Sequence, residues 1–259
     1  MADASALIPE LAALFTGDFA HYREVLVAAT DPRPAFPARE LVHPEGLTWL
    51  LRRYAPDRPD ADLRALVSQW SRSYFLRLTV PTLTANLLLD RELPVALDTL
   101  EIVLDPEGLP AAFKIPDAGV RWRTPPDGPF QRFRVLLDDN FAPFIEAMNR
   151  QVKVSRTVLW SNAANYIEWL VSAMAGRSVP ERRLADGRAL IAAEQRPDGR
   201  RNPLHEPVRY VAREGMPSPF RQRRQCCIRY LLPGLGLCEN CPHIDDPPRG
   251  VTRALAENA

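Results

Sequence analysis

The chain has 259 residues, of which 46% are hydrophobic and 25% are charged, and its formal net charge at pH 7 is +1. These proportions are typical of a globular protein with a substantial core, and the balanced charge excludes a chain held to nucleic acid or membranes by its overall charge. The first 15 residues lack a cationic region before an apolar run, so we expect no signal peptide. Apolar runs elsewhere stay short of about 18 residues, so we expect no stable membrane insertion and a cytoplasmic location.

The first 60 residues are predicted to form an irregular and partly helical N-terminal extension. Six prolines between positions 32 and 59 leave room for one short helix at 45–54. Helical spacing then takes over at 60–90, where apolar residues recur at steps of three and four. Asp60 or Asp62 is the expected N-cap of that helix.

Strands and further helices are predicted downstream. The apolar runs 100–104 and 111–115 flank a turn sequence and favour a hairpin, and another strand is predicted at 120–123. Helices are expected at 129–149, 155–175 and 181–194, and residues 208–211 are expected to return to the sheet. The fold class that follows is α+β, mainly helical with a small antiparallel sheet and a C-terminal cysteine-rich module. We expect a helical α+β domain at 61–215, the cysteine module at 216–248 and a C-terminal tail at 249–259.

All four cysteines fall within 16 consecutive positions, as Cys226, Cys227, Cys238 and Cys241. The Cys238-x2-Cys241 spacing lets two thiolates hold one metal, and a short loop with glycine and proline brings the adjacent pair to it. The spacing therefore predicts a centre ligated by four cysteines.

Several kinds of centre fit this spacing. Structural zinc usually uses two Cys-x2-Cys knuckles, because adjacent residues direct their side chains apart and close awkwardly on one tetrahedral ion. A 2Fe-2S rhomb takes two cysteines at each iron, so its ligands span a larger object. A Cys226 to Cys227 disulfide would be strained, because adjacent Cα atoms lie about 3.8 Å apart against a usual range of about 4.4 to 6.8 Å. Crossed disulfides require an oxidising compartment. His243 is a further candidate, as a Rieske-like ligand.

The residues around the cysteines resemble a known family. The stretch RRQCCIRYLLP at 223–233, followed by Cys238-Glu239-Asn240-Cys241, is similar to the C-terminal signature of the FhuF family of ferric siderophore reductases. Trp160-Ser161-Asn162, with Tyr166 and Trp169 after it, is a second match, and Gln69-Trp70 with Val80-Pro81 is a weaker third. The resemblance spans roughly residues 65 to 243 and implies a 2Fe-2S cluster held by Cys226, Cys227, Cys238 and Cys241.

Arginines are concentrated before and among the cysteines. Residues 177–229 contain 13 arginines and six acidic residues. An oxidised 2Fe-2S core with four thiolates carries about two negative charges, so nearby guanidinium groups would favour uptake of an electron. Arg223, Arg224 and Arg229 recur in the family signature, and we expect them to tune the cluster or to guide a charged donor or substrate. The other arginines fit an ordinary solvated surface, and a nucleic-acid face is disfavoured because no aromatic residues are interleaved.

Trp160 and Asn162 are candidate docking residues for the siderophore or the cluster module. The spacing of their apolar neighbours also fits plain helix packing for Trp160 and Trp169. Ser161 and Asn162 are harder to explain as core residues.

The expected function is a cytoplasmic ferric siderophore reductase that uses a 2Fe-2S cluster for one-electron reduction of Fe(III). Motifs for nicotinamide, nucleotide or hydrolase sites are missing from the sequence, so the electron is expected from a separate donor such as a ferredoxin-like protein. The alternative is a binding or interaction protein with a structural four-cysteine zinc knob. A third reading, siderophore biosynthesis, is disfavoured by the absent nucleotide-binding residues and the present cysteines.

Overall fold

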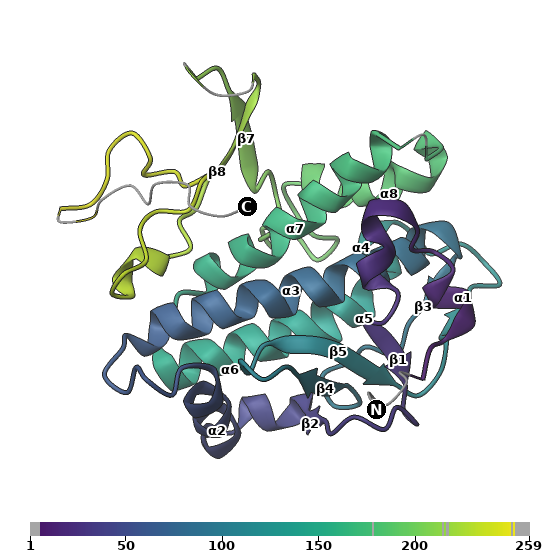
Figure 1. Ribbon diagram of the computed structural model, residues 1–259. Helices are drawn as coiled ribbons and strands as arrows, with labels where there is room; N and C mark the ends of the chain where they lie inside the picture. The colour runs from purple at the N-terminus through teal and green to yellow at the C-terminus, as the bar shows by residue number, and fades with distance from the viewer. Residues whose placement is uncertain (1–5, 178, 214, 216–217, 250, 252–259) are drawn as a thin grey trace.

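The computed structural model describes residues 6–177, 179–213, 215, 218–249 and 251. In Figure 1 a sheet lies on one side of the long helix α3 (Leu63–Leu88), and the helix α7 (Arg156–Ala175) lies on its other side. The hairpin of β7 (Val208–Val211) and β8 (Phe220–Arg223) rises beyond α7. The expected C-terminal tail, 249–259, lies outside the described residues except for positions 249 and 251. The expected division of the chain at residues 60 and 215 stays a prediction.

Helix α3 (Leu63–Leu88) is the central element of the fold. Asp62 accepts hydrogen bonds from the backbone N–H groups of Arg64 and Ala65, which confirms it as the N-cap. The 26-residue helix is buried along most of its length, and it continues through Pro81. Other elements pack against it on several sides, so its buried side chains lie on more than one face.

The main sheet has four strands, in the order β1-β5-β4-β2. Strand β4 (Glu101–Leu104) pairs antiparallel with β5 (Pro110–Ile115), which confirms the predicted hairpin. Strand β1 (Leu26–Ala28) pairs parallel with β5, so the sheet is mixed and not purely antiparallel as expected. The remaining short strands are β2 (Phe36–Pro37), which pairs with β4, and β3 (Arg91–Glu92), which pairs with β6 (Val120–Arg121) in a separate two-stranded sheet.

The N-terminal region packs into the same core as the central helix. Leu11, Tyr22 and Leu50 are buried members of the hydrophobic cluster that also contains most of the α3 core. Its elements are α1 (Pro9–Ala12), η1 (Gly17–Tyr22), η2 (Ala38–Val42) and α2 (Pro44–Tyr54). The single short helix predicted at 45–54 is therefore confirmed as α2.

The helix predicted at 129–149 is broken. It divides into α4 (Pro129–Arg132), α5 (Arg134–Leu136), the π-helical turn η3 (Leu137–Phe141) and α6 (Ala142–Val152). Pro143 has no N–H to donate to the carbonyl of Asp139, and that carbonyl accepts from the backbone N–H of Leu97 at 2.9 Å instead. The N–H of Leu97 thus takes the place of a helical donor to the Asp139 carbonyl. Helical periodicity alone could not predict this contact, because Leu97 is distant in the sequence.

The last third of the chain carries two more helices and a hairpin. Helices α7 (Arg156–Ala175) and α8 (Glu181–Ala192) confirm the predicted ranges. Strand β7 (Val208–Val211) pairs antiparallel with β8 (Phe220–Arg223), so the prediction that it returns to the main sheet is wrong. The short η4 (Arg229–Leu231) follows the first two cysteines. None of the helices in the described part of the chain combines the length and the apolarity that a membrane span requires.

Candidate metal centre

The fold brings the four cysteine thiols together. Cys226 Sγ lies 3.8 Å from Cys241 Sγ, and Cys227 Sγ lies 3.9 Å from Cys238 Sγ. Two sulfurs that share one tetrahedral metal at about 2.3 Å are separated by about 3.8 Å, so both pairs have the spacing of shared ligands. All four side chains are buried, and none forms a disulfide. Within the described ranges, no three His, Cys, Asp or Glu side chains are grouped around a single ion position, and the thiols form two pairs.

Backbone N–H groups point at two of the sulfurs. Ile228, which has a positive φ of 52°, donates its N–H to Cys226 Sγ at 3.3 Å. His243 donates its backbone N–H to Cys241 Sγ at 3.5 Å, and its ring lies edge-on to Tyr230 with the ring centroids 6.5 Å apart. Hydrogen bonds of this kind stabilise negative charge on sulfur and raise the potential of iron-sulfur centres. The contact that His243 makes with a cysteine therefore comes from its backbone.

The pKa shifts of the four thiols differ in direction. Hydrogen bonds from Cys226 and Cys238 lower the pKa of Cys227, and nearby Arg72 and Arg223 lower it further. Hydrogen bonds from the same two thiols lower the pKa of Cys241 to about 3. The pKa values of Cys226 and Cys238 are raised by their thiol neighbours and by burial. Each sulfur pair thus contains one thiol whose pKa is lowered, and thiolate is the form that binds metal.

Arg223 is a buried cation without a carboxylate partner among the described residues. It is 1% exposed, and its Nη2 donates to Asn162 Oδ1 at 2.6 Å and to Ser161 Oγ at 3.3 Å. Its Nε is buried and has no hydrogen-bond partner within the described ranges, as is also true of Arg229 Nε. A buried charge is costly unless an opposite charge offsets it. The donor set and the Arg223 guanidinium fit an anionic group bound by the thiolates.

Arg224 differs from its neighbour Arg223. Its side chain is exposed, and its Nη2 pairs with Glu206 Oε2 at 2.8 Å. A solvated ion pair of this kind contributes little to the field at a buried site. The structure therefore separates two arginines that the family signature placed together.

Arg72 is a third cation beside the cysteines, and the sequence did not predict it. Arg72 on α3 is half-buried, and its Nη1 donates to Gln69 Oε1 at 3.1 Å. Burial lowers the pKa of Arg72, but Tyr166, Cys227 and Cys238 outweigh that effect and raise it. The sequence could have indicated Arg72 by its position three residues after Gln69, because residues one helical turn apart lie on the same face and Gln69 belongs to the third family match.

Asn162 lies inside the interface between the helices and the cysteine module. Its Nδ2 donates to the carbonyl oxygen and to Oγ of Ser68, both at 3.1 Å. Ser68 Oγ in turn donates to the carbonyl oxygen of Cys227 at 2.6 Å. Asn162 is fully buried, whereas Trp160 is half-buried and packs against the main core. A chain of hydrogen bonds thus runs from Arg223 through Asn162 and Ser68 to a cysteine of the centre.

A second anchor holds the β7–β8 hairpin on α7. The buried carboxylate of Glu168 pairs with Arg221 Nη2 at 2.5 Å and accepts from the Tyr210 hydroxyl at 2.6 Å. Next to Arg221, the buried Gln222 donates its Nε2 to the carbonyl oxygen of Cys241 at 3.0 Å. The hairpin therefore links α7 to the backbone of Cys241, one of the four cysteines.

The comparisons with known proteins agree with this geometry. A family model described as ferric iron reductase FhuF-like transporter matches residues 68–218, which is more than half of the chain. The chain belongs to this FhuF-like family. A second model, described as the FhuF 2Fe-2S C-terminal domain, matches residues 223–243, which contain all four cysteines. The centre of this FhuF-like chain is accordingly a 2Fe-2S site, and the zinc alternative for it is wrong.

A curated relative extends the family likeness along the chain. The FhuF-like chain is 26% identical over 247 residues to a protein named ferric siderophore reductase from Escherichia coli (strain K12), and the match covers 90% of each chain. The first 60 residues, for which the sequence showed no resemblance, contribute to the same core as the family domain.

Proposed function

We propose that this FhuF-like chain is a cytoplasmic ferric siderophore reductase that works one electron at a time. The observation that carries the proposal is the set of four buried thiols at ligand spacing beside Arg223, a buried guanidinium with no carboxylate partner among the described residues. The family match and the name of the E. coli relative support it.

The chemistry follows from the properties of the two iron oxidation states. Siderophores hold Fe(III) through hard, anionic oxygen atoms, whereas Fe(II) is less charged and is held far more weakly. The 2Fe-2S group supplies one electron per turnover when reduced. Chelated Fe(III) gains that electron and leaves as Fe(II), and the chelator oxygens take up protons from water. The electron is replaced by a separate one-electron carrier, such as a ferredoxin-like protein.

The residues of the chain have distinct roles in this proposal. Cys226, Cys227, Cys238 and Cys241 hold the group. Arg223 and the backbone N–H groups of Ile228 and His243 stabilise negative charge at the sulfurs, which favours the reduced state. Arg229 and Arg224 lie nearer the surface, where they can guide a charged donor or substrate.

The test is a single-turnover reaction. The purified holoprotein is reduced with dithionite, freed of excess reductant, and mixed with a ferric siderophore and a ferrous trap. We expect reoxidation in step with Fe(II) capture, at one Fe(II) per cluster. Complete reduction followed by no reoxidation with hydroxamate, catecholate or citrate chelates of Fe(III) would overturn the function. Iron and acid-labile sulfide analysis of the same sample checks the cofactor independently.

A further inference from the structure

A cavity of about 820 Å³ lies between η1, α3 and α7. Its volume is in the range of small-molecule sites, about 300 to 1,000 Å³. The residues that matter for its chemistry are Phe19, Tyr22, Tyr166, Trp169, Arg177 and Arg221. Tyr166 and Trp169 are residues of the second family match.

The walls of this cavity are aromatic, and their charges are paired. The rings of Phe19 and Trp169 lie 6.0 Å apart, and the Arg177 guanidinium lies 4.7 Å from the centre of the Phe19 ring. Arg177 pairs with Asp18 at 2.6 Å, and Arg221 pairs with Glu168 at 2.5 Å. A ligand here would be held mainly by contact with the rings, because little unpaired charge is available to attract it.

One wall of the cavity is connected to the cysteine module. The Tyr166 hydroxyl accepts from Arg72 Nε at 3.4 Å, and Arg72 Nη1 donates to Gln69 Oε1 at 3.1 Å. Gln69 Nε2 then donates to the carbonyl oxygen of Cys227 at 3.4 Å. Arg221, on another wall, is two residues before Arg223 on β8. The cavity is therefore tied to the cysteine module through two elements, α7 and β8, and its hydrogen-bonded path to Cys227 begins at Tyr166.

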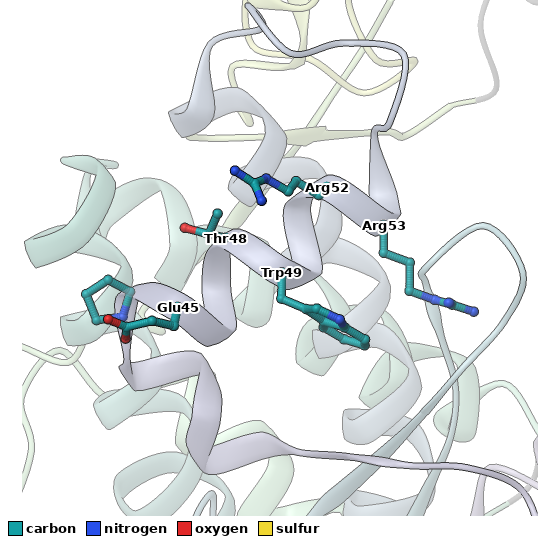
Figure 2. A pocket seen from close by; sticks show the side chains of 6 residues that line it. Glu45, Thr48, Trp49, Arg52 and Arg53 are labelled. Atoms are coloured by element: carbon teal, nitrogen blue, oxygen red, sulfur yellow. The ribbon is translucent and has the colours of Figure 1, made fainter.

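A different cavity lies on α2. Figure 2 shows this cavity, whose lining residues, including Thr48, Trp49 and Arg52, all belong to α2. Trp49 is 47% exposed and stacks on Phe36, with the ring centroids 4.8 Å apart. It offers a matched control, since it is another accessible tryptophan that lines a different cavity.

We propose that the ferric siderophore binds in the cavity between η1, α3 and α7, with its organic framework against Phe19 and Trp169 and its iron toward Tyr166. This inference rests on the proposed function, because it locates the substrate of that reaction. Electron transfer slows steeply with distance, so the end of the cavity that is tied to the cysteine module is the end where the iron belongs.

The test separates binding from reduction. Gallium(III) has the charge of Fe(III) and nearly its size but cannot be reduced under these conditions, so its chelates report binding alone. Calorimetry on the holoprotein uses the gallium(III) complexes of a tris-hydroxamate and of a tris-catecholate siderophore, and the tighter binder is carried to the variants. Ala173→Phe places a ring in the cavity, Trp169→Leu removes part of its wall, and Trp49→Leu is the control.

We expect Ala173→Phe and Trp169→Leu each to raise the Kd by about tenfold or more, and Trp49→Leu to leave it unchanged. The wild-type Kd should change little with ionic strength, because the arginines of the cavity are paired. Far-UV CD and the visible spectrum verify that each variant is folded and loaded. If folded Ala173→Phe and Trp169→Leu bind as the wild type does, the cavity is not the site, even where the wild type reduces ferric chelates. If the two cavity variants weaken binding of the gallium(III) complex but the wild type reduces no ferric chelate, the site is supported and the proposed function is overturned.

Discussion

Arg223 on β8 donates a 2.6 Å hydrogen bond to Oδ1 of Asn162 on α7. Both side chains are buried, and the guanidinium has no carboxylate partner among the described residues. Asn162 orients Arg223 without neutralising it, because an amide oxygen accepts the hydrogen bond and carries no net charge. The positive charge is thereby left for the thiolates, and Arg223 is an electrostatic partner of Cys227.

Arg223→Gln is expected to lower the midpoint potential of the centre. The reduced state is the more negative one, so it loses more stabilisation than the oxidised state when the guanidinium is removed. A change of about 1.4 kcal/mol in a one-electron couple corresponds to about 59 mV, so we expect a fall of tens of millivolts. Spectroelectrochemical titration of the holoprotein measures it.

Arg224→Gln is the matched control for that experiment. Arg224 is adjacent in sequence but is exposed and paired with Glu206, so its loss should leave the potential unchanged. If Arg224 steers an anionic donor, its variant should slow association at low salt and match the wild type at high salt. Equal shifts in potential for both variants would contradict the separate roles given to the two arginines.

Asn162→Ala is expected to destabilise the joint between the helices and the cysteine module. The change removes the 2.6 Å acceptor of Arg223 Nη2, which keeps only its 3.3 Å contact with Ser161 Oγ, and it removes the donor to Ser68. A lost hydrogen bond to a charged group costs about 1.5 to 3 kcal/mol, so we expect a loss of roughly 2 to 3 kcal/mol in the free energy of unfolding. Urea unfolding of the holoprotein measures the loss. Thr157→Ala, at an exposed position of the same helix, should cost under about 0.5 kcal/mol.

Replacing a cysteine by serine should remove the 2Fe-2S signals without unfolding the helices. Serine offers a poor alkoxide ligand in place of a soft thiolate, so Cys238→Ser or Cys241→Ser should lose the visible bands and the S = 1/2 EPR signal of the reduced protein. Far-UV CD should persist, because all four cysteines lie outside helices and strands. Wild-type spectra in all four single variants would refute the ligand assignment.

Glu168→Gln should loosen the β7–β8 hairpin. The variant removes the buried carboxylate that holds Arg221 and Tyr210, and Arg221 remains partly accessible to water. We therefore expect a local loss of roughly 1 to 3 kcal/mol, seen as faster hydrogen exchange in residues 208–213 and 220–223. Exchange in α3 should be unchanged. Glu206→Gln, which breaks the exposed pair with Arg224, should have an effect below about 1 kcal/mol.

The sequence by itself determined the features that depend on local spacing. Helical periodicity located α3, α7 and α8, the turn between two apolar runs located the β4–β5 hairpin, and the cysteine spacing indicated the metal centre. Each of these patterns is short in sequence and has one strongly favoured local structure, so no distant contact is needed to read it.

Only the tertiary structure decided which polar residues act on the centre. Arg223 and Arg224 are neighbours in sequence, but Arg223, the last residue of β8, is buried against Asn162, whereas Arg224, just past the strand, is exposed and pairs with Glu206. Arg72 reaches the cysteines from more than 150 positions away in the chain, and β1 joins the sheet through a parallel pairing with β5. These contacts depend on how elements distant in sequence pack together, and the local pattern of apolar and polar residues does not determine that packing.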